Sequence, residues 1–289
     1  MKNVRELESL FLSSPKTGNS LIIPLGYDND NIKELSFSCR GKIRNRYGSI
    51  STGNINGYSV HCNIADEGIN LLSGLLSNLC KKYSREEALF SYYNFSDIPQ
   101  NTFNFIDKLP NANRICHSAI DEQFEAEIEK LHEQYDTRYR YISQYSDCYA
   151  RAATAAQQNE AEFNLPQEIL LFHISKKDYE LKHSLQFEKH VHFLTQQLWR
   201  VGIYPIAFFE SDSVSLEFHS SRHYFGCEIV LPSSRRIRKE SSDLKHGEVL
   251  VSTGWDSWDW SAEGQEIFNI PHYDESWILN SINLPKEIT

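Results

Sequence analysis

The sequence predicts a layered α/β fold, in which a mostly parallel sheet is flanked by helices. From Ser20 onward, short apolar runs alternate with longer amphipathic stretches, and this strand–helix–strand alternation implies parallel pairing through crossover helices. Hydrophobic residues make up 40% of the 289 residues and charged residues 24%, so the chain can bury a sizeable core. The sequence contains no repeat of roughly 20–50 residues, which is the pattern that would indicate a solenoid or a propeller.

The first half of the chain has the patterns of several strands and two helices. Strands are expected where short apolar or alternating runs end at turn residues: Leu21–Leu25, Ile32–Phe37, Tyr47–Ile50, Tyr58–Ile64 and Leu89–Phe95. Helices are expected at Asn70–Tyr83 and Ser118–Tyr145, because their apolar residues recur at helical spacing. Ser118 and Asp121 resemble a capping box at the start of the second helix.

The second half continues the alternation. Further strands are expected at Ile169–Ile174, Ile203–Phe209, Glu228–Leu231 and Val249–Ser252. Leu185–Val201 has the pattern of a helix that ends at Gly202. Residues 150–164, rich in alanine and glutamine, are compatible with a solvated helix and with a mobile insertion. We expect one domain at 20–270, preceded by a lead segment at 1–19 and followed by a C-terminal tail at 271–289.

Charge and cysteine usage exclude several classes of protein. With 39 acidic and 29 basic residues the net charge is −10, which argues against a small, uniformly basic DNA-binding module but leaves room for a local basic patch. The six cysteines form no CxxC pair, so neither a zinc ribbon nor a thioredoxin motif is expected. The absence of an apolar leader or a membrane-length apolar stretch predicts a cytoplasmic protein without membrane contact.

Several stretches, in order, resemble the motor domain of FtsK/HerA-type DNA-translocating ATPases. Residues 22–28 resemble the strand that precedes the nucleotide loop, and residues 58–87 resemble the strand, phosphate loop, helix and turn that follow. Residues 165–172 resemble the strand that carries the Walker B acids, residues 199–203 the junction before the sensor strand, and residues 244–250 a later turn. The resemblance covers about residues 20–280 and implies a RecA-like fold of the P-loop NTPase type.

The resemblance places the phosphate loop where its chemistry is missing. A phosphate loop needs glycines that expose backbone N–H groups, a lysine for the β/γ-phosphates and a Ser/Thr for Mg²⁺. Ile69 replaces the lysine, Asn70 replaces the Ser/Thr, and Asp66 and Glu67 precede Gly68 in the bend. Carboxylates there would repel a triphosphate by on the order of several kcal/mol at close range.

The rest of the expected ATPase site is also degenerate. His173 and Ile174 stand where the paired acids would hold Mg²⁺ and activate water, and Phe208, Phe209 and Glu210 replace the polar residues of the sensor strand. The resemblance therefore implies a pseudo-ATPase, with no catalytic residues, no cofactor and no metal.

Two other groups of residues are candidates for contact with partners. The basic cluster fits a solvated loop and, as an alternative, a local contact with DNA phosphates; it comprises Arg235, Arg236, Arg238 and Lys239. The tryptophans of a Gly/Asp/Ser-rich stretch fit a cap on the core or an anchor for a protein partner; they are Trp255, Trp258 and Trp260.

These interpretations predict a structural or regulatory subunit of a DNA-processing complex, in translocation, mobile-element transfer or anti-phage defence. Such a subunit would work in a homo- or hetero-oligomer, beside an active ATPase or another DNA-processing protein. Two alternatives stay open. One is a Mg²⁺-dependent nuclease using Asp178, Glu180 and Lys182, and the other is an inhibitor or immunity protein whose acidic surface mimics DNA. A metal site at His219 and His223 lacks an evident third ligand.

Overall fold

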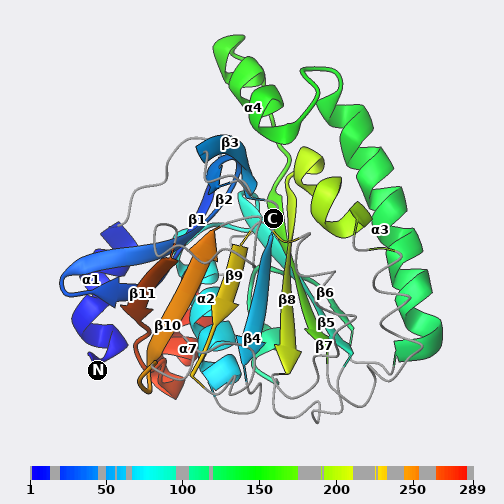
Figure 1. Ribbon diagram of the computed structural model, residues 1–289. Coiled ribbons are helices and arrows are strands. Elements are labelled where there is room, and N and C mark those ends of the chain that lie inside the picture. The colour runs from blue at the N-terminus through cyan, green and yellow to red at the C-terminus, as the bar shows by residue number, and fades with distance from the viewer. Residues whose placement is uncertain are drawn as a thin grey trace.

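Figure 1 shows the computed structural model, in which helices pack against both faces of an eleven-stranded sheet. The structure describes residues 2–13, 20–44, 50–55, 57–62, 67–95, 104–116, 120–174, 190, 192–210, 225, 227–232, 244–253 and 265–284. The strands are ordered β3-β2-β1-β11-β10-β9-β4-β8-β7-β5-β6.

Parallel and antiparallel strands occupy different parts of this sheet. Six neighbouring strands are parallel: β9 (Cys227–Val230), β4 (Tyr58–Cys62), β8 (Ile203–Glu210), β7 (Gln167–Ile174), β5 (Ala88–Phe95) and β6 (Ala112–Cys116). The remaining strands pair antiparallel: β10 (Glu248–Thr253), β11 (Gln265–Asn269), β1 (Leu21–Asp28), β2 (Asn31–Arg44) and β3 (Ile50–Ile55). The predicted α/β class, with its mostly parallel sheet between helices, is confirmed.

The helices divide between the two faces. The helices are α1 (Val4–Ser13), α2 (Ile69–Lys82), α3 (Ile120–Ile142), α4 (Tyr149–Gln158) and α7 (Glu275–Ile282), with short 3-10 turns at Ile106–Lys108 and Leu198–Val201. One buried cluster joins α1, α2 and α7 to one face of the sheet, and a second joins α3, α4 and residues 193–203 to the other. The long α3 runs along the side of the sheet, and α4 extends beyond it (Figure 1).

Two helices lie in the segments that the sequence places outside the domain, at 1–19 and 271–289. Both pack on α2, and Trp277 of α7 is only 2% exposed. With 10 and 8 residues, α1 and α7 are too short to give a strong periodic signal. Residues 150–164 begin as the helix α4, which buries one face through Ala152 and Ala156.

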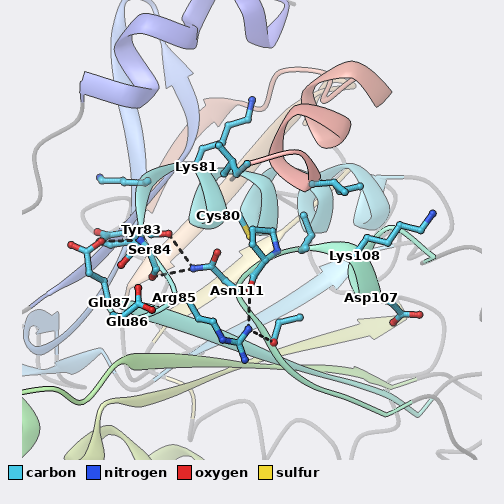
Figure 2. Close-up of a pocket in the computed structure, with 16 residues that line it drawn as sticks. Cys80, Lys81, Tyr83, Ser84, Arg85, Glu86, Glu87, Asp107, Lys108 and Asn111 are labelled. Carbon is cyan, nitrogen blue, oxygen red and sulfur yellow. Dashed lines mark hydrogen bonds between the residues drawn. The ribbon is translucent and has the colours of Figure 1, made fainter. Parts of the chain in front are cut away.

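The turn after α2 is held by one buried side chain. Asn111, which is 2% exposed, donates through Nδ2 to the carbonyl oxygens of Tyr83, Ser84 and Ala88, at 3.1, 3.2 and 2.7 Å (Figure 2). This one amide connects the end of α2 to the start of β5. It therefore fixes the conformation of the turn through which the chain enters the parallel sheet.

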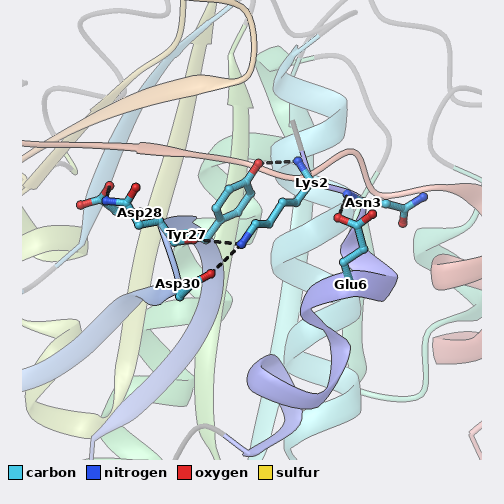
Figure 3. Close-up of polar contacts among 7 residues, drawn as sticks. Lys2, Asn3, Glu6, Tyr27, Asp28 and Asp30 are labelled. Atoms are coloured by element: carbon cyan, nitrogen blue, oxygen red, sulfur yellow. Dashed lines mark hydrogen bonds and ion pairs between the residues drawn. The ribbon is translucent and has the colours of Figure 1, made fainter.

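The amino-terminal end is tied to the turn between β1 and β2. Asn3 and Glu6 form a capping box for α1, in which the Asn3 N–H donates to Glu6 Oε2 at 3.3 Å (Figure 3). The Lys2 N–H donates to the Tyr27 hydroxyl at 2.5 Å, and Lys2 Nζ donates to Asp30 Oδ1 at 2.8 Å. These contacts place α1 beside the end of β1.

A buried carboxylate fastens α3 to the amino-terminal edge of the parallel strands. Glu168, at the start of β7, is fully buried and accepts hydrogen bonds from Ser91 Oγ at 2.5 Å, Asn113 Nδ2 at 3.0 Å and Gln134 Nε2 at 2.5 Å. Arg138 of α3 is also buried, and its guanidinium donates to the carbonyl oxygens of residues 166 and 201. The charge of Glu168 is therefore solvated by protein donors from three elements.

Replacing Glu168 with alanine is expected to lower the free energy of unfolding by about 3 kcal/mol, because the buried Ser91 hydroxyl, two further amide donors and the buried Arg138 guanidinium lose their acceptor or counter-charge. Urea unfolding followed by circular dichroism measures this change. Glu129→Ala, which changes an exposed glutamate of α3, is the matched control and should stay within about 0.5 kcal/mol of the parent. Equal effects for the two variants would contradict a structural role for the network.

Candidate functional site

The sheet topology singles out the carboxyl end of β4 as the place for a ligand. From β4 the chain passes through α2 to β5, whereas β8 connects to β9 on the opposite side of β4. In open α/β sheets, ligands bind outside the carboxyl ends of the strands where the connections diverge in this way. The loop between β4 and α2 is therefore the candidate site, and it coincides with the phosphate loop implied by the sequence resemblance.

The first turn of α2 carries no cation at the expected position. The helix begins at Ile69, and the Ile69 side chain is partly buried and packs against the main hydrophobic core. Glu67 Oε1 lies 3.5 Å from Nδ1 of His246, in the turn before β10. Asp66 lies outside the described residues, and the buried Gly68 is the N-cap residue that precedes the helix. An apolar side chain thus occupies the position at which the resemblance expects the lysine of the phosphate loop.

Asn70, which the resemblance places at the position of the Mg²⁺-binding hydroxyl, uses its side chain to bind the C-terminal segment. Its Nδ2 donates to the Pro271 carbonyl oxygen at 3.0 Å, and its Oδ1 accepts from the Tyr273 N–H at 2.9 Å. Both ends of the amide are thereby engaged with the segment that connects β11 to α7. The side chain at this position fastens the C-terminal segment to the first turn of α2.

The same stripe of α2 makes further contacts with the C-terminal segment. We call this contact the C-terminal seam; it joins Asn70, Gly74, Asn78 and Lys81 of α2 to Pro271, Tyr273 and Trp277. A Cβ atom at Gly74 would collide with the Tyr273 ring, and Asn78 Oδ1 accepts from Trp277 Nε1 at 3.1 Å. The Lys81 ammonium lies over the Trp277 ring, 2.9 Å from its centroid. The seam explains why a nearly buried helix carries glycine and asparagine.

Tyr273 links the seam to the sheet. Its hydroxyl donates to the Leu25 carbonyl oxygen of β1 at 2.7 Å and accepts from Asn78 Nδ2 at 3.2 Å. Burial raises the pKa of the Tyr273 hydroxyl well above its ordinary value, so the hydroxyl stays protonated and remains a donor. Asn78 Nδ2 also donates to the Pro24 carbonyl oxygen at 2.7 Å. Helix α2, helix α7 and strand β1 therefore share one buried hydrogen-bond network.

His173 occupies the end of β7, where the resemblance places an acid for Mg²⁺. It is fully buried, its Nδ1 lies 2.8 Å from the Tyr92 hydroxyl, and its ring meets the Phe208 ring edge-on at 4.9 Å. Burial lowers the pKa of His173 to about 3, so the imidazole is neutral at physiological pH. Ile174 follows it in β7, and Phe209 beside Phe208 is buried as well.

A histidine and a carboxylate at the same edge were not singled out by the sequence. His61 of β4 is fully buried, its Nε2 lies 3.2 Å from Glu228 Oε1 of β9, and its ring stacks on Phe209 at 5.7 Å. Both residues lie in short predicted strands far apart in the chain. Only the knowledge that β4 and β9 are neighbours could have brought them together.

Several sequence-based candidates lie outside the described residues. They are Arg235, Arg236, Arg238, Lys239, Trp255, Trp258, Trp260, Asp178, Glu180, Lys182, His219 and His223. Within the described ranges, no group of three His, Cys, Asp or Glu side chains could hold a metal ion. None of the helices in those ranges is long and apolar enough to cross a membrane.

Comparison with known proteins gives matches in structure and none in sequence. No family model matches the chain, and no curated protein does. The cytoplasmic domain of the Type VII secretion ATPase EccC from Thermomonospora curvata matches with a TM-score of 0.65 and 13% identity, over 95% of this chain and 32% of that one. The chain has the fold of an ATPase domain. The implied P-loop ATPase-type fold is thereby confirmed.

Two further structures match over nearly the whole chain. ATPases 2 and 3 of EssC from Geobacillus thermodenitrificans match with a TM-score of 0.54 and 12% identity, over 93% of this chain and 48% of that one. The pCW3 conjugation coupling protein TcpA, in its monomer form with ATPγS, matches with a TM-score of 0.54 and 12% identity, over 92% and 74%. The chain spans about a third of the EccC structure and about half of the EssC structure.

Gly74→Ala is expected to lower the free energy of unfolding by about 2 kcal/mol, because the new methyl group overlaps the Tyr273 ring. In a Tyr273→Ala background the same change should become neutral or stabilise by up to about 1 kcal/mol, since alanine is the better helix former. Urea unfolding of the four proteins of this double-mutant cycle measures the difference. Equal effects of Gly74→Ala in both backgrounds would show that Tyr273 does not set the constraint.

The buried imidazole predicts a loss of stability in acid. The pKa of His173 is lower in the folded protein than the ordinary value of 6.5, so below pH 6.5 the unfolded chain binds this proton first. The free energy of unfolding should therefore fall with decreasing pH, with a contribution that approaches about 1.4 kcal/mol per pH unit. His173→Gln should remove this part of the slope between pH 6.5 and about 4.5. His192→Gln, at an exposed histidine, should leave the slope unchanged.

Proposed function

We propose that this protein is a catalytically inactive relative of the FtsK/HerA-type ATPases, acting as a structural or regulatory subunit of a DNA-processing complex. The observation that carries the proposal is the engagement of Asn70. In a working phosphate loop this position offers a hydroxyl to Mg²⁺. Here both polar atoms of the side chain bind the C-terminal segment. Turning Asn70 toward a metal would cost two hydrogen bonds of the seam.

Two other positions support the loss of catalysis. Ile69 packs against the core where a lysine would balance the charge of the phosphates. At the end of β7, the buried and neutral His173 supplies no negative charge for Mg²⁺. Each substitution alone would weaken nucleotide binding. Together they remove the lysine, the hydroxyl and the acid on which phosphoryl transfer depends.

The role as a subunit is inferred from the fold and the charge. EccC is a secretion ATPase and TcpA is a conjugation coupling protein, so this fold serves machines that move macromolecules. A net charge of −10 disfavours DNA binding over the whole surface of the protein. Any DNA contact is therefore expected at a local patch such as the basic cluster at 235–239. We infer that the chain acts beside an active ATPase in translocation, mobile-element transfer or anti-phage defence.

Mg-ATP at millimolar concentration should leave the melting temperature of the protein unchanged, and no DNA-stimulated hydrolysis should be measured. A ligand at a hundred times its Kd would add about 2.7 kcal/mol and raise Tm by roughly 2–4 °C in a chain of this size. TcpA, whose structure contains ATPγS, is the positive control. A clear rise in Tm together with turnover would overturn the proposal.

The variant Ile69→Lys tests whether the lysine is the only missing part of the nucleotide site or whether several parts of the site are altered. If the lysine were the only lost part, this variant should gain a Tm shift with Mg-ATP. We expect no such gain, because Asn70 and His173 remain committed to structural contacts. We also expect a lower starting Tm, since a packed apolar side chain is replaced by a charged one.

A further inference from the structure

We draw no further inference here: the strongest candidate, the groove of about 1020 Å³ between the last turn of α2, the turns that lead into β5 and β6 and the end of α7 (Figure 2), carries nearly as many carboxylates as cations in its lining, and nothing in the structure shows what covers it.

Discussion

The C-terminal seam along α2 is the contact on which the arrangement of this fold depends. The Tyr273 ring needs the space left by Gly74, and its hydroxyl bonds β1 while Asn78 bonds both Tyr273 and Trp277. These groups are buried, so each unmade hydrogen bond would cost on the order of 1–3 kcal/mol. The seam thus joins an early strand, the central helix and the last helix into one body.

The seam also bears on the chemistry of the carboxyl edge. Its first contact binds Asn70, which the resemblance places at the Mg²⁺-binding position, to the backbone of residues 271–273. Nearby, buried aromatic and neutral groups such as Phe208 and His173 fill the ends of β8 and β7. The side chains of Asn70, His173 and Phe208 all make structural contacts in the folded protein.

Polar groups at the two edges of the parallel sheet serve different purposes. At the amino-terminal edge, Glu168 and Arg138 have their charges compensated by several hydrogen-bond partners, and Asn111 fixes the turns that lead into β5 and β6. Lys81, near the end of α2, lies over the Trp277 ring and has Glu8 and Asp274 as electrostatic neighbours.

By itself, the sequence determined the α/β class, most parallel strands and α2, since apolar runs and helical spacing are local signals that survive without a partner. Through its resemblance to the FtsK/HerA-type ATPases, the sequence also predicts that Ile69 and Asn70 stand where a lysine and a hydroxyl would be expected. It could not find α1, α7 or the pairing of His61 with Glu228, because short helices and contacts between distant strands leave no periodic trace. Only the tertiary structure decided what Asn70 binds, because its partners lie about 200 residues away and meet it only when α7 docks on α2.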